Sequence, residues 1–142
     1  MPVLDTVSLN SGQELPPLEK PPVSKTQILR YAGASGDDNL IHTDVETARE
    51  RGLDGVIAHG MLSMGFLGHY LTYLAGPGAT RRLNVRFAAM VRLGDALTCR
   101  GTIGSVVMQP DGSLLTTLEI WAENQRGERV TIGDAEVLVG ET

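Results

Sequence analysis

Cysteine is nearly absent from this sequence of 142 residues. Its single example, Cys99, has no partner within the chain, so an internal disulfide is excluded. Cys99 stands in the stretch DALTCRGTI, which is typical of a strand, where a thiol usually serves as a small buried apolar group. A chain that does not depend on disulfides suits a reducing compartment, and we expect it to be cytoplasmic.

Long hydrophobic runs and an excess of basic residues are also lacking. The opening residues, MPVLDTVSLNSGQELPP, contain neither a basic start nor the apolar run that directs export, and no stretch approaches the roughly 18 apolar residues that span a bilayer. The net charge of -5 and the pI near 5.1 oppose a general attraction to nucleic acid or to an anionic membrane. We expect neither as a partner.

Aromatic residues make up only 4% of the chain, but hydrophobic residues together reach 42%, which is enough to build one core. We predict a single domain over residues 1–142. Its first 22 residues or so form an irregular extension in which PPLEKPPV favours extended or edge-strand conformations, with a short strand at most.

Three helices are predicted from capping residues and periodicity, at residues 25–34, 45–51 and about 58–74. Ser24 and Asp44 are candidate N-caps of the first two, and Gly52 ends the second. The third helix, AHGMLSMGFLGHYLTYL, is apolar almost all round, so it should lie inside the protein.

Four β-rich runs follow, separated by RLGD, QPDGS and NQRGE, and we predict strands at residues 82–88, 96–107, 113–124 and 128–139. The last two breaks are typical of hairpins, so these strands should form an antiparallel meander. One buried helix followed by antiparallel strands indicates an α+β fold in which a sheet wraps around the helix.

The segment between the first two helices, SGDDNLIHTD at residues 35–44, crowds acidic side chains, an amide and a histidine around the apolar pair Leu40 and Ile41. Read alone, it is an ordinary turn whose polar groups satisfy the backbone. The stretch that contains it, YAGASGDDNLIHTD, resembles the hydratase motif of the MaoC-like hot-dog family, aromatic-Ala-x-x-Ser-Gly-Asp-x-Asn-Pro-hydrophobic-His-x-Asp.

The resemblance extends over roughly residues 24–139 and includes IAHGMLSMG and NVRFAAMVRLGD in the right order. The family contains R-specific enoyl-CoA hydratases and mycobacterial hydroxyacyl-ACP dehydratase subunits. The resemblance implies the hot-dog fold, in which an antiparallel sheet wraps around a long central helix. Two positions depart from the pattern, because Leu40 and Met90 stand where the family has proline.

The resemblance implies that Asp37 and His42 are the catalytic pair. It also implies that Asn39 is a structural or water-positioning amide and that Gly60 donates a backbone N–H to the thioester carbonyl. His59 and Ser63 are further candidates for binding the substrate.

Several of these and other polar residues have a plainer structural interpretation. His59 would cap or orient the start of the long helix, and Ser63, which lies outside any G-x-S-x-G elbow, would be a small packing residue. His69, further along that helix, is expected in packing or in a subunit interface. Arg82 and Arg86 share one face of a strand, where they would contact coenzyme A phosphates or form a solvated strand end.

Hydration of an α,β-unsaturated thioester needs a base for water, an acid for C2 and stabilisation of an enolate-like oxygen. A carboxylate and an imidazole can hold one water, and an N–H at a helix N-terminus can face the oxygen. Which of Asp37 and His42 is the base stays open, because a coupled pair shares its protons. No His, Cys and carboxylate cluster has metal-ligand spacing, so neither a metal nor a cofactor is expected.

The expected function is therefore that of a hydro-lyase that reversibly converts trans-2-enoyl thioesters of coenzyme A or acyl carrier protein to (R)-3-hydroxyacyl thioesters. A hot-dog thioesterase and a non-catalytic subunit of a heteromeric dehydratase are the alternatives. The resemblance also implies a dimer with a continuous sheet, either a homodimer or a heterodimer with a related subunit. Acyl chain length, carrier and physiological direction cannot be predicted from the sequence.

Overall fold

The computed structural model describes residues 1–140, and residues 141 and 142, the end of the predicted domain, lie outside this part. The elements in chain order are β1 (Leu18–Glu19), α1 (Lys25–Ser35), the 3-10 helix η1 (Leu40–His42), α2 (Val45–Glu50), α3 (Gly60–Ala75), β2 (Thr80–Phe87), β3 (Thr98–Met108), β4 (Leu114–Glu123) and β5 (Arg129–Val139).

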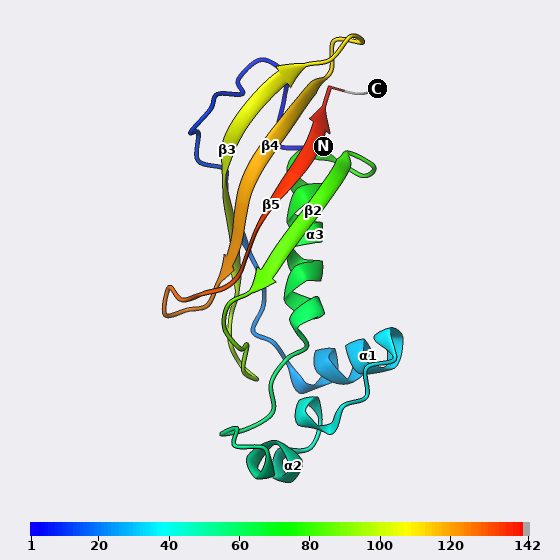
Figure 1. The fold of residues 1–142 in the computed structure, drawn as a ribbon, viewed down its shortest axis with the longest axis vertical. Helices are drawn as coiled ribbons and strands as arrows, with labels where there is room; N and C mark the ends of the chain where they lie inside the picture. The colour runs from blue at the N-terminus through cyan, green and yellow to red at the C-terminus, as the bar shows by residue number, and fades with distance from the viewer. Residues whose placement is uncertain (141–142) are drawn as a thin grey trace.

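Within residues 1–140 the strands form one five-stranded antiparallel sheet in the order β1-β3-β4-β5-β2. The meander of β3, β4 and β5 is the one predicted from the turn sequences, and β2 closes the far edge by pairing with β5. Figure 1 shows this sheet curving along α3, while α1 and α2 both lie toward the N-terminal end of α3. The predicted α+β architecture is confirmed.

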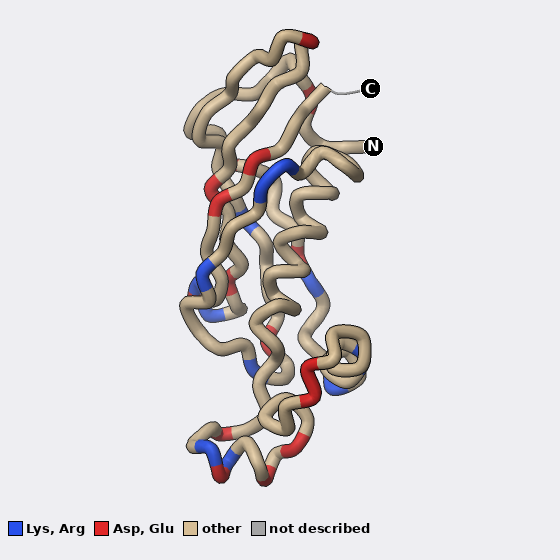
Figure 2. Tube along the Cα trace, turned by 45° about the vertical axis from the view of Figure 1, so that its right-hand side comes forward, with Lys and Arg blue, Asp and Glu red and all other residues tan. Residues whose placement is uncertain are grey.

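The core lies between α3 and the concave face of the sheet. α3 carries no Lys, Arg, Asp or Glu over its 16 residues, and the helix is uninterrupted tan in Figure 2. One of its faces buries the residues Leu62, Phe66, Leu67, Tyr70, Leu71 and Leu74. The opposite face is open in this chain, since Met61 is 53% exposed, so the prediction that the whole helix lies inside is only half correct.

The structure begins α3 at Gly60, two residues later than the predicted start at Ala58. The reason is a tertiary hydrogen bond: the Ala58 N–H donates to the carbonyl oxygen of Val91 at 2.7 Å, which keeps Ala58 in an extended segment.

Cys99 is fully buried in β3, as predicted. None of the helices within residues 1–140 combines the length and apolar character needed to cross a bilayer.

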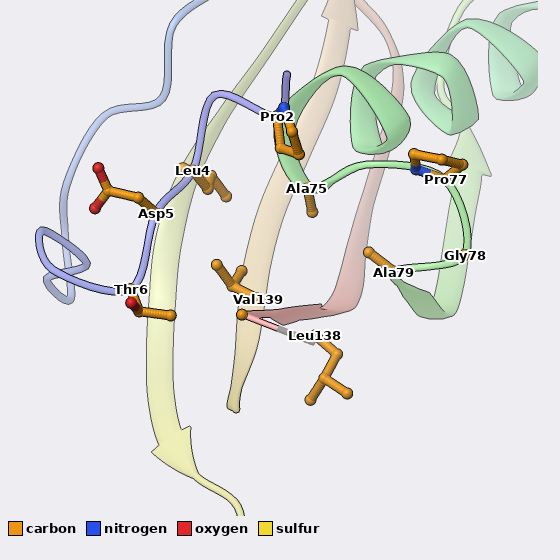
Figure 3. A pocket seen from close by; sticks show the side chains of 11 residues that line it. Pro2, Leu4, Asp5, Thr6, Ala75, Pro77, Gly78, Ala79, Leu138 and Val139 are labelled. Atoms are coloured by element: carbon orange, nitrogen blue, oxygen red, sulfur yellow. The ribbon is translucent and has the colours of Figure 1, made fainter. Parts of the chain in front are cut away.

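The first 22 residues contain the short strand β1, and their start runs beside the C-terminal end of α3, where the N–H groups of Val3 and Leu4 donate to the Leu74 carbonyl. A pocket of about 520 Å³ lies there, between Pro2, Leu4, Ala75 and Leu138 (Figure 3). Among the described residues that line it, Asp5 alone has an ionisable side chain. A 16-residue helix is about 24 Å long, so this pocket is remote from the segment that joins α1 to α2.

Candidate active site

The loop between α1 and α2 carries the candidate pair, and local capping fixes its backbone. α1 ends at Gly36, whose φ of 74° is left-handed and therefore favours glycine. Asn39 Oδ1 accepts the N–H of Ile41 at 3.2 Å and caps η1, and Asp44 Oδ2 accepts the N–H of Thr47 at 2.9 Å and caps α2. Both ends of the segment from residue 37 to 42 are thus held by its own sequence.

The side chains of Asp37 and His42 face each other. His42 Nε2 lies 3.7 Å from Asp37 Oδ2, and the imidazole is buried whereas the carboxylate side chain is 53% exposed. Asp37 Oδ1 accepts the N–H of Asn39 at 3.3 Å, which leaves Oδ2 directed toward the imidazole. A separation of 3.7 Å is too long for a direct hydrogen bond and is compatible with one water shared by both groups.

The tautomer of neutral His42 follows from its other ring nitrogen. Nδ1 lies 2.7 Å from the carbonyl oxygen of Ile57, and because a carbonyl only accepts, Nδ1 carries the proton. Nε2 is then an acceptor, as is the ionised carboxylate of Asp37. One water can donate its two hydrogens to these two acceptors, which leaves a lone pair on the water oxygen directed away from both.

His59 supports this pair from behind. Its ring stacks on that of His42 with centroids 3.8 Å apart, and it contacts the Tyr31 ring at 4.9 Å. Its Nε2 donates to the carbonyl oxygen of Asp37 at 2.9 Å, while its buried Nδ1 has no hydrogen-bond partner within residues 1–140. His59 occupies the N-cap position of α3 without a side-chain capping bond, so it orients the loop and not the helix.

A pocket of about 240 Å³ opens beside His42. It lies between the start of α3, the end of β2 and the segment after it, and its lining residues are His42, Ile57, Ala58, Gly60, Ser63, Phe87, Ala89, Met90 and Val91. Apart from the imidazole and the Ser63 hydroxyl, the side chains of this lining are apolar. The arrangement suits a small acyl group whose reacting carbons face His42.

Gly60 forms the wall of this pocket at the first residue of α3, where backbone N–H groups have no acceptor within the helix. A Cβ atom at this position would lie 3.2 Å from three ring atoms of Phe87. The missing side chain therefore gives room to the Phe87 ring. The sequence did not predict Phe87 and Met90 as pocket residues, although the motif RFAAM contains both and Met90 was noted as a departure from the family's proline; both side chains are partly exposed.

Ser63 and Asn39 differ in their relation to the pocket. The Ser63 hydroxyl lines it, but donates to the Gly60 carbonyl at 2.8 Å and lies 2.7 Å from Thr131 Oγ1, so its hydrogen is already engaged. Asn39 is exposed, does not line the pocket and caps η1, which favours the structural role. A substrate-binding role for Asn39, Ser63 or His59 stays a prediction.

Asp37, His42 and His59 offer three potential metal ligands within 4.8 Å of one another. Their geometry opposes a metal ion bound by both imidazoles, because ring lone pairs lie in the ring planes. The two planes are inclined by only 25° with centroids 3.8 Å apart, and they do not converge on one ion about 2.1 Å from each nitrogen. The expectation of a metal-free site stays a prediction.

Two other candidates have partners elsewhere. Arg82 pairs with Asp134 and with Glu136 on the neighbouring strand β5, which favours a structural role over phosphate binding. His69 is exposed on α3, so it does not pack in the core of this chain, and it contacts Lys20. Its place in a subunit interface stays a prediction.

Residues 9–111 match the family model described as the MaoC like domain. The chain belongs to this family. This MaoC-like chain is 39% identical over 87 residues to an (R)-specific enoyl-CoA hydratase of Rhodospirillum rubrum, a match that covers 60% of each protein. It is 34% identical over 125 residues to 3-hydroxyacyl-thioester dehydratase X of Mycobacterium tuberculosis, covering 80% of this chain and 41% of the relative. The chain thus spans 60% or less of the length of these relatives.

The fold of the MaoC-like chain is similar to that of an (R)-hydratase from A. caviae involved in PHA biosynthesis. The TM-score is 0.81 at 26% sequence identity, and the similarity covers 94% of this chain and 99% of the other. The predicted hot-dog fold is confirmed.

Proposed function

We propose that this MaoC-like chain is a hydro-lyase that reversibly hydrates trans-2-enoyl thioesters to (R)-3-hydroxyacyl thioesters. The observation that carries the proposal is the pair formed by Asp37 and His42, which face each other at 3.7 Å beside an apolar pocket. The names of the two relatives, an enoyl-CoA hydratase and a hydroxyacyl-thioester dehydratase, refer to the two directions of such a reaction and support it.

In the hydration direction, the pair binds the attacking water. With His42 neutral and protonated on Nδ1, its Nε2 and the Asp37 carboxylate accept the two water hydrogens. The proposal requires the oxygen lone pair to face C3 of an enoyl group held in the pocket beside His42. As the oxygen–carbon bond forms, one of the two groups takes a proton, and the pair returns a proton to C2.

The negative charge that develops on the thioester oxygen needs hydrogen-bond donors. Gly60 lines the pocket at the start of α3, where free N–H groups and the helix dipole favour an anion. The Phe87 ring lies against Gly60 and lines the same pocket. Fixed donors of this kind stabilise an enolate without reorganisation during the reaction.

The substrates of this proposal are thioesters of coenzyme A or acyl carrier protein, no cofactor takes part, and the reaction takes place in the cytoplasm. A homodimer, or a heterodimer with a related hot-dog subunit, is the proposed assembly. Because the water is bound on one side of a fixed enoyl plane, it reaches one face of C3. The (R) product is proposed because the named relative is an (R)-specific hydratase.

The test is an assay of the purified chain with crotonyl-CoA and longer trans-2-enoyl-CoA esters. Loss of enoyl absorbance, a 3-hydroxyacyl product and no release of free thiol are expected, with the (R) enantiomer dominant on chiral chromatography. Thiol release without hydration would identify a thioesterase instead. Inactivity alone, with activity restored by a related hot-dog subunit, would identify a non-catalytic subunit.

A further inference from the structure

Lys20 is held in an unusual environment on the side of α3. Its backbone N–H donates to the carbonyl oxygen of Leu97 at 2.8 Å, and two prolines, Pro21 and Pro22, follow it and restrict the chain. Its Nζ contacts Nδ1 of His69 and lies 5.3 Å from the centroid of the Phe66 ring. The side chain is therefore fixed against the helix instead of moving freely in solvent.

The contact between Lys20 and His69 joins two basic groups. No carboxylate of residues 1–140 forms an ion pair with Lys20, so nothing in the described structure compensates a second positive charge there. With Lys20 as the donor in this contact, Nδ1 of His69 is the acceptor of a neutral imidazole. An amine with a neutral imidazole beside it has a built-in proton acceptor.

The surroundings also favour the uncharged amine. Burial lowers the pKa of the Lys20 ammonium, an effect that the nearby Cys99 only partly opposes. The thiol itself does not compete as a nucleophile, because Cys99 is fully buried and burial raises its pKa to about 11. Lys20 is the group of this cluster suited to attack an electrophile.

We propose that Lys20 is a self-acylation site, at which the amine takes an acyl group from an acyl-coenzyme A thioester with His69 as the base. The neutral amine attacks the carbonyl carbon, a carbon–nitrogen bond forms and the carbon–sulfur bond breaks. The surplus proton on nitrogen passes to His69 Nδ1 and then to the departing coenzyme A thiolate. The products are an Nε-acyl-lysine amide and free coenzyme A.

The position of Lys20 leaves it open to a thioester from solution. Lys20 is half-buried and His69 is exposed. Lys20 directly follows β1, which forms the opposite edge of the sheet from β2. A dimer joined through β2 would therefore leave this edge free, and the proposal places His69, which contacts Lys20, outside the subunit interface. The inference goes beyond the proposed function and does not depend on it, although a protein that binds acyl thioesters would meet this reagent at every turnover.

The chain supplies its own control, because its sequence contains only two lysines, Lys20 and Lys25. Lys25 is exposed at the start of α1, and its side chain forms no hydrogen bond or ion pair with the described residues. The full chain is incubated with acetyl-CoA, which has no double bond to hydrate, so the result is independent of hydratase activity. Acetylation of both lysines is followed by peptide mass spectrometry after cleavage at residues other than lysine.

We expect Lys20 to be acetylated at least about tenfold faster than Lys25, and His69→Gln to remove this advantage without changing the rate at Lys25. Glutamine can accept the lysine hydrogen bond but cannot take the proton. Thermal unfolding of His69→Gln checks that the exposed substitution preserves the fold. A Lys20 rate less than tenfold above that of Lys25, or a Lys20 rate unchanged by His69→Gln, would overturn the proposal.

Discussion

Separate replacement of Asp37 by Asn and His42 by Gln tests whether the pair does chemistry or only holds a turn. Asn at position 37 keeps an oxygen that can accept the Asn39 N–H, and the side chain is 53% exposed, so a loss of stability below about 1 kcal/mol is expected. Gln at position 42 loses the bond to the Ile57 carbonyl and leaves this partly buried oxygen without a partner, which costs about 1–3 kcal/mol.

The kinetic effect should be far larger than these structural effects. If the two groups exchange protons with water and substrate, each replacement lowers kcat by roughly 10²- to 10⁴-fold while the protein stays folded. Because both groups bind the same water, the double variant should be little worse than either single one. Independent roles would instead make the two losses multiply.

Asp38→Asn is the matched control, since this substitution removes the same charge from the same loop. The Asp38 side chain is exposed and forms no hydrogen bond with residues 1–140. Crotonyl-CoA hydration and thermal unfolding are measured for all variants. Retention of more than about a tenth of wild-type kcat by both Asp37→Asn and His42→Gln, outside the usual range for acid–base groups, would refute the catalytic assignment. Equal losses in Asp38→Asn would indicate an effect of net charge.

Three further predictions follow from contacts around the pair. His59→Phe keeps the stacking on His42 but loses the bond to the Asp37 carbonyl, so it should cost about 1 kcal/mol in thermal unfolding and lower kcat at least roughly tenfold; unchanged kcat would exclude a positioning role. The unpaired edge of β2 should join a second copy, and sedimentation of an active monomer at low micromolar concentration would contradict this. Leu40→Pro should stabilise the chain by about 0.4–1 kcal/mol with kcat retained, and destabilisation would show that the loop needs the Leu40 N–H.

Local signals were enough to predict the frame of the site. Ser24 caps α1 and Asp44 caps α2 as expected, because an N-cap bond joins residues two or three positions apart and depends little on the rest of the fold. The turn sequences around β4 defined the meander for the same reason. The 3-10 helix from Leu40 to His42 was missed, since three residues carry no periodicity to detect.

The contacts that give the candidate pair its chemistry are tertiary and leave no pattern in the sequence. The carbonyl of Ile57 fixes the tautomer of His42, and any residue type could supply that carbonyl. The Phe87 ring against Gly60 joins the end of β2 to the start of α3, two elements whose relative position depends on the whole core. The charged partners of Arg82 lie on β5, and this pairing also depends on how the strands are arranged in the fold, so the sequence alone could not show it.

Leu40 illustrates how the loop keeps its shape without the family's proline. Its carbonyl accepts the N–H groups of Thr43 at 3.1 Å and Asp44 at 2.8 Å, so the turn is fixed from the acceptor side. Leu40 is the first residue of η1, where a missing N–H costs nothing and the φ of a 3-10 helix matches that of proline. The preceding Asn39 has ψ of 124°, within the range preferred before proline. Proline at position 40 would therefore restrict the unfolded chain more than it would change the folded loop. The geometry of Asp37 and His42 depends on the hydrogen bonds that the carbonyl of residue 40 accepts, and both leucine and proline have this carbonyl.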